Sequence, residues 1–105
     1  MADIRRAAFK EKFVKDLDFT DFKVSVSGSI VNLSEGGFLM GDGTGEVYVN
    51  ISGMENPAVK NEKDLVRVMG RIMPYENGFE IQADIIQDLN GADMGALKRI
   101  KEALL

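Results

Sequence analysis

Apolar and polar residues alternate along much of the chain between residues 23 and 88, which is the spacing of β-strands. The first strand-like run extends from Lys23 to Leu33, and its inward row is Val24, Val26, Gly28 and Ile30. Val31 and Leu33 then continue the apolar row on the opposite parity. A change of parity near a glycine predicts a bulge or a sharp bend, which lets one strand join two parts of a small barrel.

Two hairpins follow this bent strand. The first runs from Phe38 to Val49 and reverses at Gly41–Gly45, where glycine permits positive φ angles and Asp42 can bond to the turn amides. The second begins at Leu65 and turns within Pro74–Gly78, which contains an Asn-Gly signal. Its inward rows are expected to be Val66, Val68, Gly70 and Ile72, followed by Phe79, Ile81, Ala83 and Ile85.

Helical spacing appears at both ends. Phe9, Phe13 and Leu17 share one face of an expected helix over Asp3–Leu17, which would cap one end of the barrel. The alternative is that this cation-rich helix docks on a membrane surface or an acidic partner. A final helix is expected after an N-cap at Asn90 or Asp93, with an apolar face formed by Met94, Leu97, Ile100, Leu104 and Leu105.

The order of these elements predicts a mainly β protein: a five-stranded OB-fold barrel with N-terminal and C-terminal helices. We divide the 105 residues into an N-terminal helical extension (1–22), the barrel (23–88) and a C-terminal amphipathic helix (89–105), all within one structural domain.

Composition narrows the function classes. The chain has no Cys and no His, so thiolate chemistry, the commonest general base and the commonest metal ligands are missing. We therefore expect a protein that is not an enzyme and uses no cofactor. No apolar run approaches the ~20 residues that cross a bilayer, and the N-terminus does not resemble a signal peptide. We expect a cytoplasmic protein without a membrane partner.

Charge argues against strong autonomous binding of nucleic acid. The net charge is −4, and the segment from Lys23 to Asp88 holds five basic and ten acidic residues. Nucleic-acid binders usually present a basic surface that releases counterions from phosphates.

Three segments nevertheless resemble one family. Val26–Val31, Phe38–Gly45 and Val66–Ile72 are similar to the OB-fold domains of replication protein A and its archaeal relatives, with their glycine-centred first strand, Asp-Gly-Thr-Gly hairpin and Val-x-Val-x-Gly fourth strand. A barrel followed directly by an amphipathic helix is similar to the middle and small subunits of that family. The resemblance implies single-stranded DNA as a ligand, other OB-fold subunits as partners, and a terminal helix that bundles with partner helices.

The residues at positions matching the binding face of OB-folds are candidates for this function. Stacking would use Phe38, Tyr48 and Tyr75, with Phe79 as a further aromatic, and phosphate contacts would use Lys23, Arg67 and Arg71. For each there is a structural alternative. Phe38 and Phe79 can be buried, and Tyr75 can simply pack against its neighbours in the turn. The arginines can pair with Glu80 or Asp84 on a solvated outer face. Tyr48 lies between two inward valines and is the strongest candidate.

The sequence thus predicts a single-stranded DNA-binding component of a replication protein A-like complex. It would bind without sequence preference, and Met94, Leu97, Ile100 and Leu104 would engage a partner. The alternative is an assembly subunit that touches no nucleic acid. RNA is a further option, because contacts to the 2′-hydroxyl are not readable from sequence.

Overall fold

The computed structural model describes residues 9–54, 61–90, 95, 99 and 102–103. Its elements, in chain order, are strand β1 (Lys10–Glu11), the short 3₁₀ turn η1 (Val14–Asp16), and strands β2 (Lys23–Leu33), β3 (Gly37–Gly41), β4 (Glu46–Asn50), β5 (Leu65–Tyr75) and β6 (Gly78–Asp88). The fold is mainly β, as predicted.

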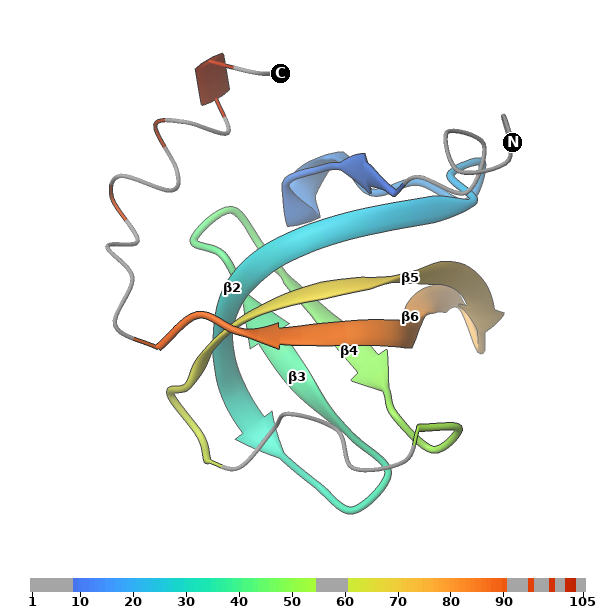
Figure 1. The fold of residues 1–105 in the computed structure, drawn as a ribbon. Helices are drawn as coiled ribbons and strands as arrows, with labels where there is room; N and C mark the ends of the chain where they lie inside the picture. Colours follow the sequence, from blue (N-terminus) through green and yellow to red (C-terminus); the bar gives the residue numbers. More distant parts are fainter. Residues whose placement is uncertain (1–8, 55–60, 91–94, 96–98, 100–101, 104–105) are drawn as a thin grey trace, which may run out of the picture.

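Strands β2 to β6 close into a five-stranded barrel (Figure 1). Neighbouring strands follow the order β2-β3-β4-β6-β5, and β5 returns to pair with β2. All pairings within the barrel are antiparallel except β4 with β6, which is parallel and joins Val49 to Ile81 and Asn50 to Gln82. This connectivity is that of the predicted OB-fold.

The core fills the barrel with the inward row of each strand. Its fully buried side chains are Phe38, Ile30, Met40, Ile81, Val24, Val26, Val49, Val66 and Val68. Alternation along each strand sends every second residue outward. The outward residues of β3 and β4 are therefore Gly37, Leu39, Gly41, Glu46, Tyr48 and Asn50.

The predicted bend in β2 is present. The register with β3 shifts between Ile30 and Asn32, so Val31 leaves the ladder and is 45% exposed, while Ile30 stays in the core. Gly28 lies where β2 crosses β3 most closely, since a Cβ there would overlap the carbonyl oxygen of Gly41. The curvature of β2 in Figure 1 follows from this bulge and close approach.

The prediction for the last inward row was wrong at its end. Ile81 and Ala83 are buried as expected, but Ile85 is 45% exposed and Ile86 takes the inward place. A second register shift is the cause, because Gly70 pairs with Ala83 whereas Met69 pairs with Ile85, which leaves Asp84 as the extra residue. Alternation alone could not reveal this bulge.

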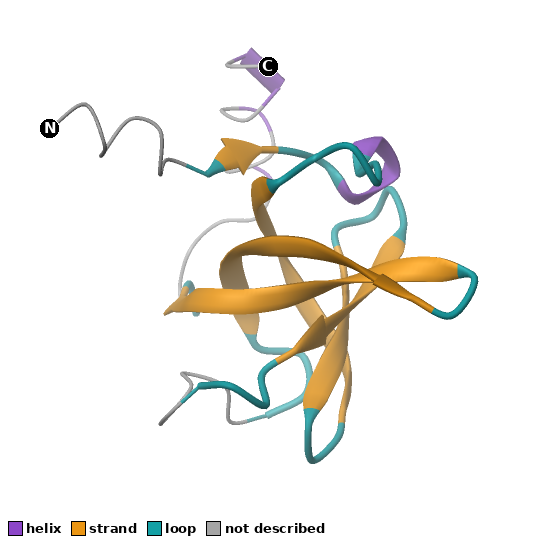
Figure 2. Ribbon diagram, turned by 90° about the vertical axis from the view of Figure 1, so that its right-hand side faces the viewer, coloured by secondary structure: helices purple, strands orange, loops and turns teal. Residues whose placement is uncertain are grey.

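The N-terminal helix predicted over Asp3–Leu17 is wrong for the residues that the structure describes. Lys10–Glu11 forms a short parallel strand on the edge of β2, and the backbone is extended at both Phe13 and Leu17. Only the 3₁₀ turn η1 separates these positions, beside one end of the barrel (Figure 2). Residues 1–8 of the predicted helix lie outside the described part of the chain.

Tertiary hydrogen bonds explain why this segment is not helical. The carboxylate of Asp42 accepts the Val14 amide at 2.9 Å, and the Thr44 hydroxyl accepts the Lys15 amide at 3.1 Å. The Lys12 amide donates to the Ser25 carbonyl at 3.0 Å. These bonds hold the segment against the β3–β4 hairpin and bury Val14 beside Gly45. Such contacts override a weak local helix preference.

The predicted C-terminal helix is not established over its length. Gly95, Arg99, Glu102 and Ala103 have helical backbone and are exposed, and the intervening residues lie outside the described part of the chain. Among described residues, the structure contains no helix with the length and apolar character needed to cross a membrane.

Candidate nucleic-acid interface

Two outer surfaces of the barrel carry the predicted site residues. We call the outward side of β3 and β4, together with the facing parts of the β5–β6 hairpin, the tyrosine face, because it holds Tyr48 and Tyr75. We call the outward side of β1, the first half of β2 and β5 the cationic face, because it holds Lys23, Arg67 and Arg71. In the closed strand order, β5 lies between β2 and β6 and so across the barrel from the β3–β4 pair.

Tyr48 is fixed on the tyrosine face by the backbone beneath it. The phenol end of its ring lies over Gly37, where a Cβ would come within 2.6 Å of the hydroxyl oxygen and would also overlap the Val49 carbonyl oxygen. The hydroxyl lies 3.4 Å from the Ser34 Oγ, which itself donates to the Gly37 carbonyl. Glycine at position 37 therefore lets the ring lie against the sheet, leaving its outer side available for stacking.

A cleft of about 410 Å³ lies beside this ring. It is lined by Gly36, Tyr48, Asn50, Ser52, Tyr75 and Glu80. Tyr75 enters from the tip of the β5–β6 hairpin and is 56% exposed. The structure thus brings together the two tyrosines predicted from the sequence, which are 27 positions apart in the numbering.

A chain of hydrogen bonds forms the floor of the cleft. The Ser52 amide and hydroxyl both donate to Asn50 Oδ1, at 2.9 and 2.7 Å. This fixes the orientation of the Asn50 amide, whose Nδ2 donates to Glu80 Oε2 at 3.0 Å. Glu80 is only 7% exposed. Sequence reasoning assigned no binding role to Asn50, Ser52 or Glu80; the outward parity of Asn50 beside Tyr48 was the one available signal.

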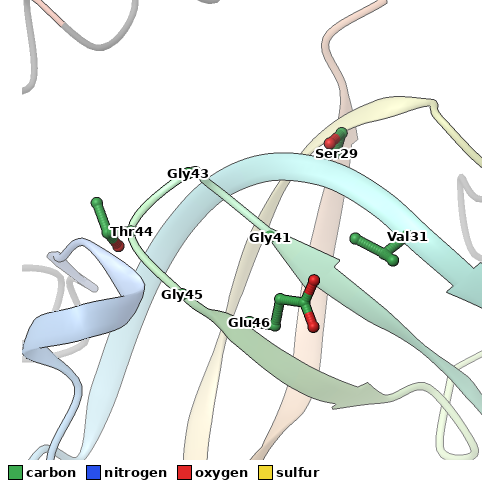
Figure 3. Close-up of a pocket in the computed structure, with 7 residues that line it drawn as sticks. All are labelled: Ser29, Val31, Gly41, Gly43, Thr44, Gly45 and Glu46. Carbon is green, nitrogen blue, oxygen red and sulfur yellow. The ribbon is translucent and has the colours of Figure 1, made fainter.

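A second, shallower hollow of about 630 Å³ continues the tyrosine face toward the β3–β4 turn (Figure 3). Its lining residues are Ser29, Val31, Gly41, Gly43, Thr44, Gly45 and Glu46. Gly41 forms its floor, with the side chains of Glu46 and Val31 on either side. Because Gly41 pairs with Glu46 and Gly37 with Asn50, the two hollows lie at opposite ends of the same strand pair.

The tyrosine face offers aromatic and apolar surface but little positive charge. Among the described residues, those that line its two hollows include the carboxylates of Glu46 and Glu80 and no Lys or Arg. A strand bound here would be held by stacking and hydrogen bonds, with few of the phosphate contacts that dominate most nucleic-acid complexes.

Two aromatic candidates do not belong to this surface. Phe38 is completely buried in the core, so it cannot stack on a base, and the alternative of burial is correct. Phe79 is half-buried at the edge of the core and makes an edge-to-face contact with Phe19 at 5.2 Å between ring centroids.

The cationic candidates also lie away from Tyr48. Arg71 forms two hydrogen bonds to the Asp84 carboxylate, at 3.0 and 3.2 Å, so the paired alternative is correct for this residue. Arg67 Nε lies 3.9 Å from a Glu11 carboxylate oxygen. Lys23 Nζ lies over the rings of Phe9 and Phe22, 5.5 and 5.9 Å from their centroids. Strand β6 separates β5 from β4, and neither Arg67 nor Arg71 lines the cleft that holds Tyr48.

Two further predictions concern sites beyond this surface. The proposed partner-binding residues Met94, Leu97, Ile100 and Leu104 lie outside the described residues. Among the residues that are described, no group of three or more His, Cys, Asp or Glu side chains could hold a metal ion.

Comparison with known proteins supports the fold. No protein family model matches the chain, and no curated protein matches its sequence. A chain of the S. pombe Stn1–Ten1 complex superposes with a TM-score of 0.73 at 13% identity, covering 91% of this chain and 90% of that one. A chain of a replication protein A heterotrimer bound to single-stranded DNA superposes with a TM-score of 0.62 at 17% identity. The match covers 76% of this chain and 67% of that one.

The hypothetical protein ygiW of E. coli is also similar, with a TM-score of 0.60 and 24% identity over 80% of this chain and 92% of that one. All three identities are low, so the likeness concerns architecture: the chain shares its barrel fold with a chain of the Stn1–Ten1 complex, with ygiW and with the replication protein A heterotrimer.

Proposed function

We propose that this chain is a non-catalytic OB-fold subunit of an assembly that handles single-stranded DNA, and that the strand runs along the tyrosine face. The observation that carries this proposal is the cleft that both Tyr48 and Tyr75 line, on the β3–β4 surface and beside the β5–β6 hairpin. OB-folds bind oligonucleotides at this position. The likeness to replication protein A and to a chain of the Stn1–Ten1 complex supports it.

The charge distribution favours a subunit that works with others. Stacking contributes about 1–3 kcal/mol per base and tolerates any base, so two tyrosines give modest and largely sequence-independent affinity. Because the tyrosine face is acidic, contacts with phosphates would add little to its affinity for a strand. Partner subunits would supply the missing cations, and the C-terminal segment containing Met94, Leu97, Ile100 and Leu104 would hold the assembly together.

The second candidate is a subunit that binds only proteins. It is favoured by one specific observation: no Lys or Arg is among the described residues that line the two hollows. In that case the tyrosine face would contact a partner protein, and oligonucleotides would not bind.

Fluorescence anisotropy with a labelled ~15-nucleotide oligothymidine separates these candidates, since an OB-fold covers ~4–16 nucleotides. We expect a dissociation constant of about 10–100 μM at low salt with a shallow salt dependence, because few phosphates are neutralised. Tyr48→Ala should weaken binding about tenfold. Arg71→Ala is the matched control on the cationic face and should leave binding within about twofold, because Arg71 already pairs with Asp84.

No binding by the wild-type chain would favour the protein-only subunit. A steep salt dependence together with a larger loss in Arg71→Ala than in Tyr48→Ala would instead move the strand to the cationic face. An oligouridine of equal length tests the RNA option in the same assay.

A further inference from the structure

Glu80 is an unusual residue for a surface that binds nucleic acid. Its side chain lines the cleft and is more than nine-tenths buried, at 7% exposure. Carboxylates are rarely buried unless they are paired with a cation or fully hydrogen-bonded. Among the described residues, no Lys or Arg forms an ion pair with it, and its one hydrogen bond comes from Asn50 Nδ2 to Oε2. The other carboxylate oxygen, Oε1, accepts no hydrogen bond from a described residue.

The side-chain amide of Asn50, next to Glu80, is held in one orientation. Both Ser52 donors hold Asn50 Oδ1, so the amide cannot turn over without losing two hydrogen bonds. Of the two N–H groups on Nδ2, one is used by Glu80. Among the described residues, no second hydrogen bond uses Asn50 Nδ2, so the cleft presents an N–H donor next to the Glu80 carboxylate and beside the ring of Tyr48.

The four bases differ in the hydrogen-bond donors and acceptors on their edges, and these differences decide which base suits a carboxylate. A carboxylate only accepts hydrogen bonds. Guanine carries two adjacent donors, N1–H and the N2 amino group, followed by the O6 acceptor, along one edge. Adenine and cytosine place a ring nitrogen acceptor beside their amino donor, which would repel the carboxylate. Thymine has a single N–H between two carbonyl acceptors.

We propose that the juxtaposition of Tyr48, Asn50 and Glu80 forms a guanine-selective position within an otherwise sequence-tolerant strand path. The base stacks on the Tyr48 ring, its N1–H and N2–H groups donate to the Glu80 carboxylate, and the Asn50 amide donates to O6. Unstacked bases are read in this way, by an aromatic platform and by hydrogen bonds to the Watson–Crick edge. This inference rests on the proposed function, since it requires the strand to lie on the tyrosine face.

The test uses three oligomers of equal length: oligothymidine, alternating thymidine–deoxyguanosine, and alternating thymidine–deoxyinosine. Inosine stacks as a purine and keeps N1–H and O6 but lacks the N2 amino group, so it isolates one donor. We expect the guanosine oligomer to bind about five- to tenfold more tightly than oligothymidine, with the inosine oligomer between them.

Glu80→Gln should abolish the guanosine-over-inosine difference, because the neutral amide no longer offers two acceptor oxygens to N1–H and N2–H. The matched control is Glu76→Gln, which removes an equal charge from the exposed hairpin turn beside the cleft and should keep the preference. Thermal melts of both variants verify that they are folded.

The outcomes separate this inference from the proposed function. Equal affinity of the wild-type chain for all three oligomers would overturn guanine selection and leave strand binding intact. A guanosine preference that persists in Glu80→Gln would overturn the assignment to this carboxylate. Failure of every oligomer to bind would overturn the proposed function and the inference with it.

Discussion

On the cationic face, Arg71 meets the Asp84 carboxylate and Lys23 lies over two aromatic rings, whereas on the tyrosine face the carboxylate of Glu80 meets no cation among the described residues. The positive charges of Arg71 and Lys23 are therefore already engaged within the fold, whereas the Glu80 carboxylate remains available to a ligand. Cations mark a binding surface only when their head groups are free. Here the better candidate is the surface that carries the aromatic rings of Tyr48 and Tyr75 beside the carboxylate of Glu80.

The largest expected effect tests how firmly the tyrosine face depends on its backbone. Gly37→Ala should destabilise the protein by about 3 kcal/mol, because the added Cβ overlaps the Val49 carbonyl oxygen and the Tyr48 ring. Urea unfolding measures the change. Gly36→Ala is the matched control, since a Cβ there meets no atom within 4 Å, and it should change the stability little. Equal behaviour of the two variants would mean that the ring is not seated on Gly37.

A second prediction concerns the contact between the β3–β4 turn and the N-terminal segment. Asp42 accepts the amides of Val14 and Thr44 and the Thr44 hydroxyl, so Asp42→Ala should cost about 2 kcal/mol and release the N-terminal segment from the hairpin. Hydrogen exchange at the Val14 amide should accelerate well beyond the change in the β5–β6 strands. Asp42→Asn keeps one acceptor oxygen and should give an intermediate effect. Uniform acceleration over all strands would contradict a local role for Asp42.

A third prediction concerns the effect of the buried Glu80 carboxylate on stability. Removing the buried charge in Glu80→Gln should leave the free protein unchanged or stabilise it by about 1 kcal/mol, because the desolvation penalty of the carboxylate disappears. Thermal unfolding compared with Glu76→Gln, where the carboxylate is exposed, measures this. A clear loss of stability would show that the fold itself needs the Glu80 carboxylate.

The smallest effect is expected on the cationic face. Arg71 and Asp84 are about 40% and 33% exposed, so solvent screens their attraction and a double-mutant cycle should give a coupling of only about 0.5 kcal/mol. The cycle uses the unfolding free energies of Arg71→Ala, Asp84→Ala and the double variant. A coupling several times larger would mean that this pair organises the barrel rather than simply neutralising its surface.

The barrel could be predicted from the sequence because alternation and turn residues act locally. The bulge in β2 was visible as a change of parity near Gly28, and the strand between Leu65 and Met73 had an unbroken inward row. The bulge at Asp84 was not visible, since Ala83, Ile85 and Ile86 are all apolar enough for either parity. The N-terminal segment was mispredicted because its amides bond to Asp42 and Thr44, which are 28 and 29 residues away.

The site was harder to predict than the fold. Tyr48 was predicted to point outward because it alternates with two inward valines, and the structure places it beside Tyr75 in one cleft; a binding role for both stays a prediction. Arg67 and Arg71 were grouped with Tyr48 because their positions match the binding face of OB-folds, although strand order places β5 across the barrel from β3 and β4. Glu80 was considered only as an ion-pair partner, because its burial depends on the parallel pairing of β4 with β6, which no local pattern encodes.

The short strand β1 occupies a strand edge that could otherwise pair with another chain. Lys10–Glu11 covers the edge of β2 at Val24–Ser25, where β3 does not reach. Exposed strand edges are templates for pairing with another chain. Truncating the chain at the boundary between the N-terminal extension and the barrel would remove β1. A chain beginning at Phe22 would therefore expose the edge of β2 at Val24–Ser25. Sedimentation velocity of that shortened chain should show concentration-dependent dimers that the full chain does not form.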